Sequence, residues 1–146
     1  MEQQLSVILQ KECSLLAELK QNLLLEQQAL LERSAEKLHT LCHRKTELEK
    51  SLQQLEAERL LLTGQRSLKE LAKNPEQAEL LELGEKLKTL LRETRELQQA
   101  NLLLIKCELA VWEQVQNSLF PQIKSYTATG SLEKEKTELG LIVHRA

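Results

Sequence analysis

Three side chains that can ligate a metal stand close together in one stretch with a helical pattern. His39 and His43 are four residues apart and so lie on one face of a helix, with Cys42 beside them. Imidazole and thiolate suit zinc, but no fourth ligand is evident and no Glu occupies the position that a zinc protease needs. We therefore interpret the pair as part of a polar helix face.

The acidic residues exclude several other kinds of chemistry. All 22 carboxylates are Glu and no Asp is present, so a Ser-His-Asp triad, a calcium loop and a Walker-type magnesium site are excluded. The four glycines form no Gly-rich phosphate loop, and the net charge of -2 gives no basic surface for nucleic acid. The sequence thus predicts no catalytic site, no cofactor, no metal and no nucleic-acid partner.

The cysteines and the hydropathy bear on location. Cys13, Cys42 and Cys107 are odd in number and widely spaced, which is typical of a reducing cytosol. Cys107 has apolar neighbours and is expected to be a buried thiol. The sequence shows no basic leader and no run of apolar residues long enough for a membrane span, so we expect a cytoplasmic protein without direct membrane insertion.

Two leucine-rich rows with helical spacing predict the helices that must position the residues discussed above. The first ladder steps by three and four residues and has Leu at six of its eight positions: Leu5, Leu9, Glu12, Leu16, Leu19, Leu23, Glu26 and Leu30. The second ladder also has six leucines: Leu38, Leu41, Lys45, Leu48, Leu52, Leu55, Arg59 and Leu62. Such spacing predicts amphipathic helices. Arg59 is expected either to reach water along its stem or to pair with a buried Glu.

The helix boundaries follow from capping residues. Ser34 is a candidate N-cap between the two ladders, which predicts two helices folded back on each other; one uninterrupted helix through residue 62 is the alternative. Gly64 ends the second helix, Asn74 and Pro75 start a third, and Pro121 closes it. The predicted helices are 3–33, 35–63 and 75–120, with one or two further turns within 65–73.

The third helix carries an apolar stripe that changes register. The stripe begins at Leu80, Leu83, Leu87 and Leu90 and ends at Leu102, Ile105, Leu109 and Trp112. A two-stranded coiled coil would keep one register, so the pattern favours an all-α antiparallel bundle of three long helices that share a leucine core. The bundle is expected to span 1–120, followed by a flexible segment 121–146 or a short fourth helix.

The segment 121–146 is the most promising place for a partner. The chain's three aromatic residues, Trp112, Phe120 and Tyr126, fall where the helical pattern stops. A small polar linker around Tyr126 precedes a mixture of Glu, Lys and apolar residues that includes Leu132, Leu139, Ile142 and Val143. A helix this short is marginal alone in water, so it docks on its own bundle or folds on a partner.

Several short stretches along the chain carry a resemblance to a known family: Leu25-Glu26-Gln27-Gln28 with Leu30, Lys45 with Leu48 and Leu52, Leu55-Glu56 with Arg59, and Asn101 with Leu103 and Leu104. In this order they resemble the FlgN family of flagellar type III export chaperones. The segment Tyr126-Thr127-Ala128-Thr129-Gly130 is similar to a Tyr-Gly-Ala-x-Gly motif that follows the last long helix in the family. Thr127 stands where the family often has Gly.

The resemblance implies a non-enzymatic chaperone for the hook-filament junction proteins FlgK and FlgL. It implies that Leu132, Leu139, Ile142 and Val143 bind substrate and that Tyr126 docks on the export gate protein FlhA. The chain is expected to be a monomer or a weak homodimer. A coiled-coil scaffold that acts by self-association is the second hypothesis, and a metal-dependent enzyme using His39 and His43 is the third.

Overall fold

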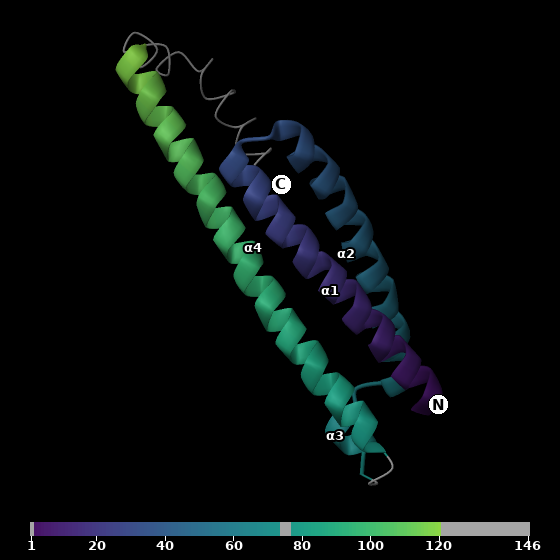
Figure 1. Cartoon of the computed structure of the whole chain (residues 1–146). Helices are drawn as coiled ribbons and strands as arrows, with labels where there is room; N and C mark the ends of the chain where they lie inside the picture. Colours follow the sequence, from purple (N-terminus) through teal and green to yellow (C-terminus); the bar gives the residue numbers. More distant parts are fainter. Residues whose placement is uncertain (1, 74–76, 121–146) are drawn as a thin grey trace. The chain divides into compact units, whose positions relative to one another are not determined.

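The computed structural model describes residues 2–73 and 77–120 (Figure 1), and every regular element within them is helical. The helices are α1 (Glu2–Glu32), α2 (Ala35–Thr63), α3 (Leu68–Leu71) and α4 (Ala78–Leu119). This confirms the all-α class. The chain divides into two compact units, residues 1–101 and 102–146, and α4 contributes to both.

A tight turn at Arg33 and Ser34 separates α1 from α2. Ser34 is the N-cap, and its side chain accepts a hydrogen bond from the backbone N–H of Lys37 at 3.4 Å. Arg33 adopts a positive φ of 57°, a conformation that reverses the chain after a helix. The predicted break at Ser34 is confirmed, and the alternative of one continuous helix is wrong.

Local signals also shape the connection from α2 to α4. Gly64, at a φ of 61°, follows α2, and its N–H donates to the carbonyl of Leu60 at 2.8 Å. Ser67 and Glu70 then form a reciprocal capping box at the start of α3. Gly84 of α4 lies against the Leu68 side chain, where a Cβ would come within 2.8 Å of Leu68 Cδ1. The predicted start at Asn74 and Pro75 lies outside the described residues.

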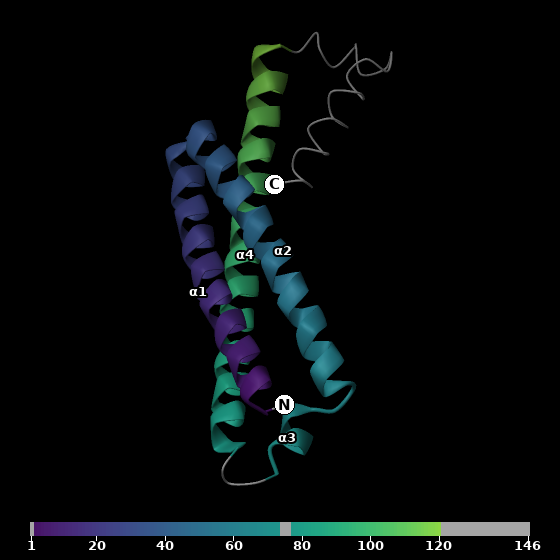
Figure 2. The same cartoon turned by 90° about the vertical axis from the view of Figure 1, so that its right-hand side faces the viewer.

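The core of the first unit forms where α1 packs against both α2 and the first part of α4 (Figures 1 and 2). α2 runs antiparallel to α1. α4 runs parallel to α1, because residue numbers increase together along both helices in three contacts. These contacts are Cys13 Sγ to the Leu83 carbonyl, Lys20 to Glu93, and the Leu23 carbonyl to Asn101. Consecutive long helices therefore alternate in direction, as the sequence predicts.

The second unit contains the last part of α4, residues 102–119, and Phe120. None of residues 102–120 is buried. The apolar stripe that the sequence analysis follows as far as Trp112 is therefore not buried in the part of α4 after Asn101. The expected burial of Cys107 is wrong, since Cys107 lies in this part of α4 and is exposed.

Candidate functional site

The residues expected to contact partners fall outside the described structure. Tyr126, Leu132, Leu139, Ile142 and Val143 all lie within 121–146, outside the described residues. Their roles stay predictions. Among the described residues, those that could contact a partner lie in the last part of α4, directly before the 121–146 segment.

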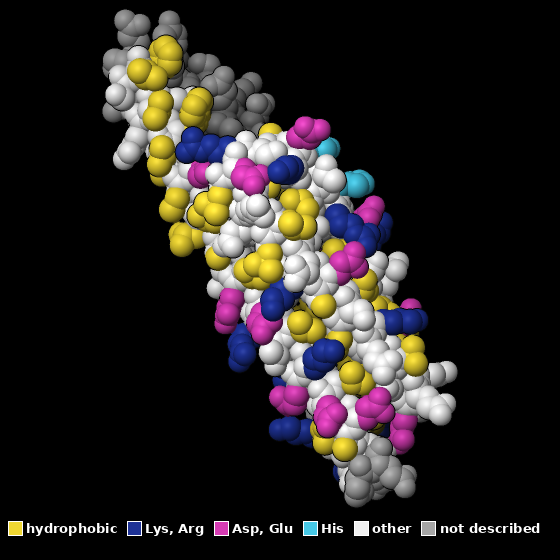
Figure 3. All heavy atoms as spheres, viewed as in Figure 1, with side chains coloured by type: hydrophobic (Ala, Val, Ile, Leu, Met, Phe, Trp, Pro, Cys, Tyr) yellow, Lys and Arg dark blue, Asp and Glu magenta, His cyan; other side chains and the backbone are white. Residues whose placement is uncertain are grey.

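The last part of α4 presents apolar side chains to solvent. Yellow side chains gather along this part of the helix in Figure 3. Trp112 is 54% exposed and Leu119 is 66% exposed, values that a core residue would not show. Other exposed apolar side chains here are Leu102, Leu103, Val111, Val115 and Phe120. Exposed apolar surface of this kind marks sites of interaction rather than of catalysis.

A change of register at Asn101 separates the buried part of α4 from this exposed part. Leu80, Leu87, Thr94 and Asn101 follow one face and are buried. The next apolar row begins one position later and runs Leu102, Ile105, Leu109, Trp112 and, past Gln116, Leu119; we call this row the terminal face. At 100° per residue only Leu102 is turned by about 100° from Asn101, whereas Trp112 and Leu119 return to within about 20° of it. The terminal face is therefore exposed although it lies on the same side of α4 as the buried row.

Asn101 marks this change with a polar contact. Its side chain is 2% exposed, and its Nδ2 donates a hydrogen bond to the Leu23 carbonyl at 2.9 Å. Burial of a side-chain amide costs free energy unless the amide has a hydrogen-bond partner such as this carbonyl. The contact ties α4 to α1 at the last residue of the first unit.

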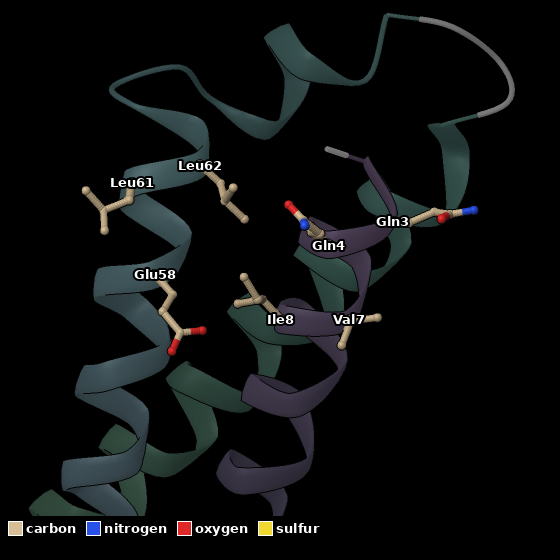
Figure 4. A pocket seen from close by; sticks show the side chains of 7 residues that line it. All are labelled: Gln3, Gln4, Val7, Ile8, Glu58, Leu61 and Leu62. Atoms are coloured by element: carbon tan, nitrogen blue, oxygen red, sulfur yellow. The ribbon is translucent and has the colours of Figure 1, made fainter.

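A second apolar surface lies on the first unit, between the start of α1 and the end of α2. It is an open groove of about 540 Å³ lined by Gln3, Gln4, Val7, Ile8, Glu58, Leu61 and Leu62 (Figure 4). Ile8 and Leu62 face each other across it, whereas Leu61 points away from α1. The sequence pattern missed this groove, because Val7 and Leu61 stand beside the ladders rather than on them.

Two ion pairs interrupt the leucine core between α1 and α2. Arg59 Nε donates to Glu12 Oε1 at 3.2 Å, and Lys45 Nζ lies 3.8 Å from Glu26 Oε2. Glu12 is 3% exposed and Glu26 is 2% exposed. These four residues are the only positions in the two ladders that are not Leu, so each gap in the first ladder meets a gap in the second. Of the two expectations for Arg59, pairing with a buried Glu is confirmed.

The electrostatics of these pairs are dominated by loss of water. Burial raises the pKa of Glu12 above its usual range, and the charge and hydrogen bond of Arg59 oppose that rise only in part. Burial likewise raises the pKa of Glu26, against the opposing charge of Lys45. Both carboxylates pair with a cation within the α1–α2 interface, which assigns them a structural role.

The metal-ligating candidates show no arrangement of ligands. His39 and His43 are exposed on α2, and His43 Nε2 lies 3.7 Å from Glu47 Oε1. No group of three His, Cys, Asp or Glu side chains within 2–73 and 77–120 could hold a metal ion. Burial raises the pKa of the Cys13 and Cys42 thiols, which makes them poorer nucleophiles at neutral pH.

Comparison with protein families decides between these interpretations. The family model described as "FlgN protein" matches residues 1–134, which includes the whole first unit and most of the second. The chain belongs to the FlgN family. Neither the curated proteins nor the solved structures compared with the chain give a match.

Membership of the FlgN family gives the coarse function, that of a flagellar chaperone. This agrees with a site made of exposed apolar side chains. Within the described ranges, no helix of this FlgN-family chain is long and apolar enough to cross a membrane. The match extends to residue 134, past the end of α4 and over Tyr126 and Leu132.

Proposed function

We propose that the chain is a cytoplasmic export chaperone that binds FlgK and FlgL, keeps them soluble and delivers them to the type III export gate protein FlhA. The observation that carries the proposal is the FlgN family match, which covers the first unit, α4 to its end and the 121–146 segment as far as residue 134. In this proposal Leu132, Leu139, Ile142 and Val143 bind cargo, and Tyr126 docks on the gate.

The exposed end of α4 supports a binding function of this kind. An unassembled filament-type subunit exposes an amphipathic helix, and such helices are recognised by apolar grooves or helix faces. The terminal face supplies apolar side chains directly before the segment that carries the cargo-binding residues. A short segment that folds when it binds gives up part of its affinity to ordering, which suits a cargo that must be released.

Co-purification with each cargo tests the proposal. Tagged full-length chain is expected to retain FlgK or FlgL, and a chain lacking residues 131–146 is expected to lose both while keeping its helical circular dichroism. Loss of helicity on truncation would contradict the division between bundle and binding segment. Failure of the intact chain to retain either cargo would contradict the proposal itself.

A matched pair of full-length variants separates apolar contact from mere length. Replacement of Leu132, Leu139, Ile142 and Val143 by Ser is expected to abolish cargo retention. The control replaces Glu133, Lys134, Glu135 and Lys136 by Ser, which changes as many residues of the same segment and leaves its net charge unaltered. Equal loss in both variants would count against apolar recognition.

Gate docking is tested at Tyr126. Tyr126→Ala is expected to spare cargo binding and to weaken binding to the cytoplasmic part of FlhA, because aromatic side chains anchor interfaces. Tyr126→Phe, which keeps the ring, is the control for the hydroxyl. Parallel loss of cargo and gate binding in Tyr126→Ala would argue against separate roles.

The exposed terminal face also favours the alternative, a scaffold that acts by self-association. A second copy that covers this face would produce a mass that rises with concentration in sedimentation. A monomer mass that is independent of concentration would eliminate the scaffold, whereas a strong dimer that retains no cargo would favour it.

A further inference from the structure

We propose that, before cargo arrives, the segment 131–143 folds back antiparallel on the terminal face of α4, with Leu139 against Trp112. The proposal deepens the proposed function, and rests on it, by adding a state in which the cargo-binding residues occupy the chain's own apolar face. Cargo then binds by displacing this segment.

The terminal face lacks a partner among the described residues. Leu109 is half-buried, whereas Trp112 and Leu119 expose more than half of their surface. The three share one stripe of the helix, because 109, 112 and 119 lie within about 80° of one another at 100° per residue. An apolar stripe of this width is suited to one covering helix.

The spacing of the apolar residues beyond α4 mirrors this stripe. Backward along α4, the steps from Leu119 to Trp112 and on to Leu109 are seven and three residues. Forward along the segment, the steps from Leu132 to Leu139 and on to Ile142 are also seven and three. Two helices with mirrored spacing match when they run antiparallel, with Leu139 placed against Trp112.

The same relation holds where the structure shows two helices packed together. The gaps in the first ladder at Glu12 and Glu26 are fourteen residues apart, as are Lys45 and Arg59 in the second ladder. The ion pairs join Glu12 to Arg59 and Glu26 to Lys45, so the two ladders match as mirror images. In this molecule, mirrored spacing therefore accompanies antiparallel packing.

The chain between the two stripes is long enough for the reversal. Residues 120–131 can span up to about 40 Å when extended, whereas the stripe from residue 109 to residue 119 is about 15 Å long. Pro121 stops the helix at the start of this connection, and Gly130 precedes Ser131, a candidate N-cap.

The tether favours the chain's own segment over a second copy. A short linker holds the segment at an effective concentration in the millimolar range, far above the micromolar concentration of a purified protein. The covered state reduces the apparent affinity for cargo by the fraction of molecules in which the segment is docked. It also keeps Trp112 and Leu119 out of water when no cargo is bound.

Trp112 is the only tryptophan of the chain, so its fluorescence reports on this face directly. We would record the emission wavelength and acrylamide quenching of full-length protein and of three single variants. Leu139→Ser removes the side chain placed against Trp112, and Leu119→Ser removes a neighbour on the terminal face. Leu103→Ser is the matched control, since Leu103 is 63% exposed, Leu119 is 66% exposed, and Leu103 lies on the side of α4 opposite Trp112.

The expected result is a shift of emission to longer wavelength with stronger quenching for Leu139→Ser, a smaller shift in the same direction for Leu119→Ser and none for Leu103→Ser. An unchanged emission in Leu139→Ser would overturn the proposal. A shift that appears only at high protein concentration would also overturn it, because the cover would then be a second copy. Cargo retention by the intact chain is measured separately. If the intact chain retains no cargo while the variants show the expected fluorescence shifts, the proposed function is contradicted and the fold-back is not.

Discussion

The two parts of α4 differ in burial although both are rich in apolar residues. From Leu80 to Asn101 the helix lies against α1 and contributes buried side chains to a common core. From Leu102 to Phe120 it carries as dense an apolar pattern, yet none of those side chains is buried. A leucine row therefore predicts a helix with an apolar face, and only a second row with matching spacing predicts what covers that face.

The largest expected difference between the two regions is the response to loss of a leucine. Leu23→Ala should lower the free energy of unfolding by about 2–5 kcal/mol, because Leu23 is fully buried and its removal leaves a cavity. Leu103→Ala removes the same atoms from a residue that is 63% exposed and should change stability by less than about 0.5 kcal/mol. Urea unfolding followed by circular dichroism measures both, and equal losses would erase the distinction between the regions.

The ion pairs allow a sharper test of what holds the first region together. Arg59→Leu leaves Glu12 buried without its cation and should cost about 3 kcal/mol at neutral pH. The double variant Glu12→Leu/Arg59→Leu fills both gaps with apolar side chains and should recover to within about 1 kcal/mol of the wild type. Arg44→Leu is the control: its pair with Glu18 is half-exposed and should contribute less than about 1 kcal/mol. A double variant as unstable as the single one would show that the pair itself stabilises the fold.

The smallest expected effect is on pH dependence, and its sign differs between two carboxylates. Burial raises the pKa of Glu26, so the folded state holds its proton more tightly than the unfolded chain does. The wild type should therefore gain stability relative to Glu26→Gln as pH falls from neutrality towards about 4.3, the ordinary Glu value.

Glu93 provides the opposite case on α4. The hydrogen bond from Lys20 lowers the pKa of Glu93, so its contribution is present above the ordinary value and is lost as pH falls through the lowered one. Relative to Glu93→Gln, the wild type should lose stability on acidification, by a small amount because both side chains are about one-third exposed. Unfolding midpoints measured across this range would contradict the assignment if the two variants changed in the same direction.

Much of the fold could be predicted from the sequence because its signals are local. The ladders, the cap at Ser34 and the stop at Gly64 act within one or two turns of helix, and the structure places each of them as expected. The pairing of Glu12 with Arg59 could also have been predicted, because the two positions that are not Leu are equally far apart in both ladders. That comparison requires the ladders to be matched in reverse order.

The site could not be predicted in the same way, because exposure depends on what is absent from a neighbourhood. Trp112 and Cys107 have the apolar neighbours in sequence that buried residues have, yet both are exposed. The groove beside Val7 and Leu61 arises from residues next to the ladders, which only the packing of two helices reveals. The partner-contacting roles of Tyr126, Leu132, Leu139, Ile142 and Val143 stay predictions.

The placement of the charges in the ladders has a consequence for the order of synthesis. α1 leaves the ribosome before α2, and its ladder holds two carboxylates and no cation. Pairing of two nascent α1 segments would leave Glu12 and Glu26 against leucine or against each other, so chains on neighbouring ribosomes gain little by associating through this helix. Lys45 and Arg59 of α2 pair with the two carboxylates when they are buried, and α2 follows α1 in the same chain after a two-residue turn. The charges in the ladders thus favour pairing of α1 with α2 of the same chain, and this pairing can form before α4 has been synthesised.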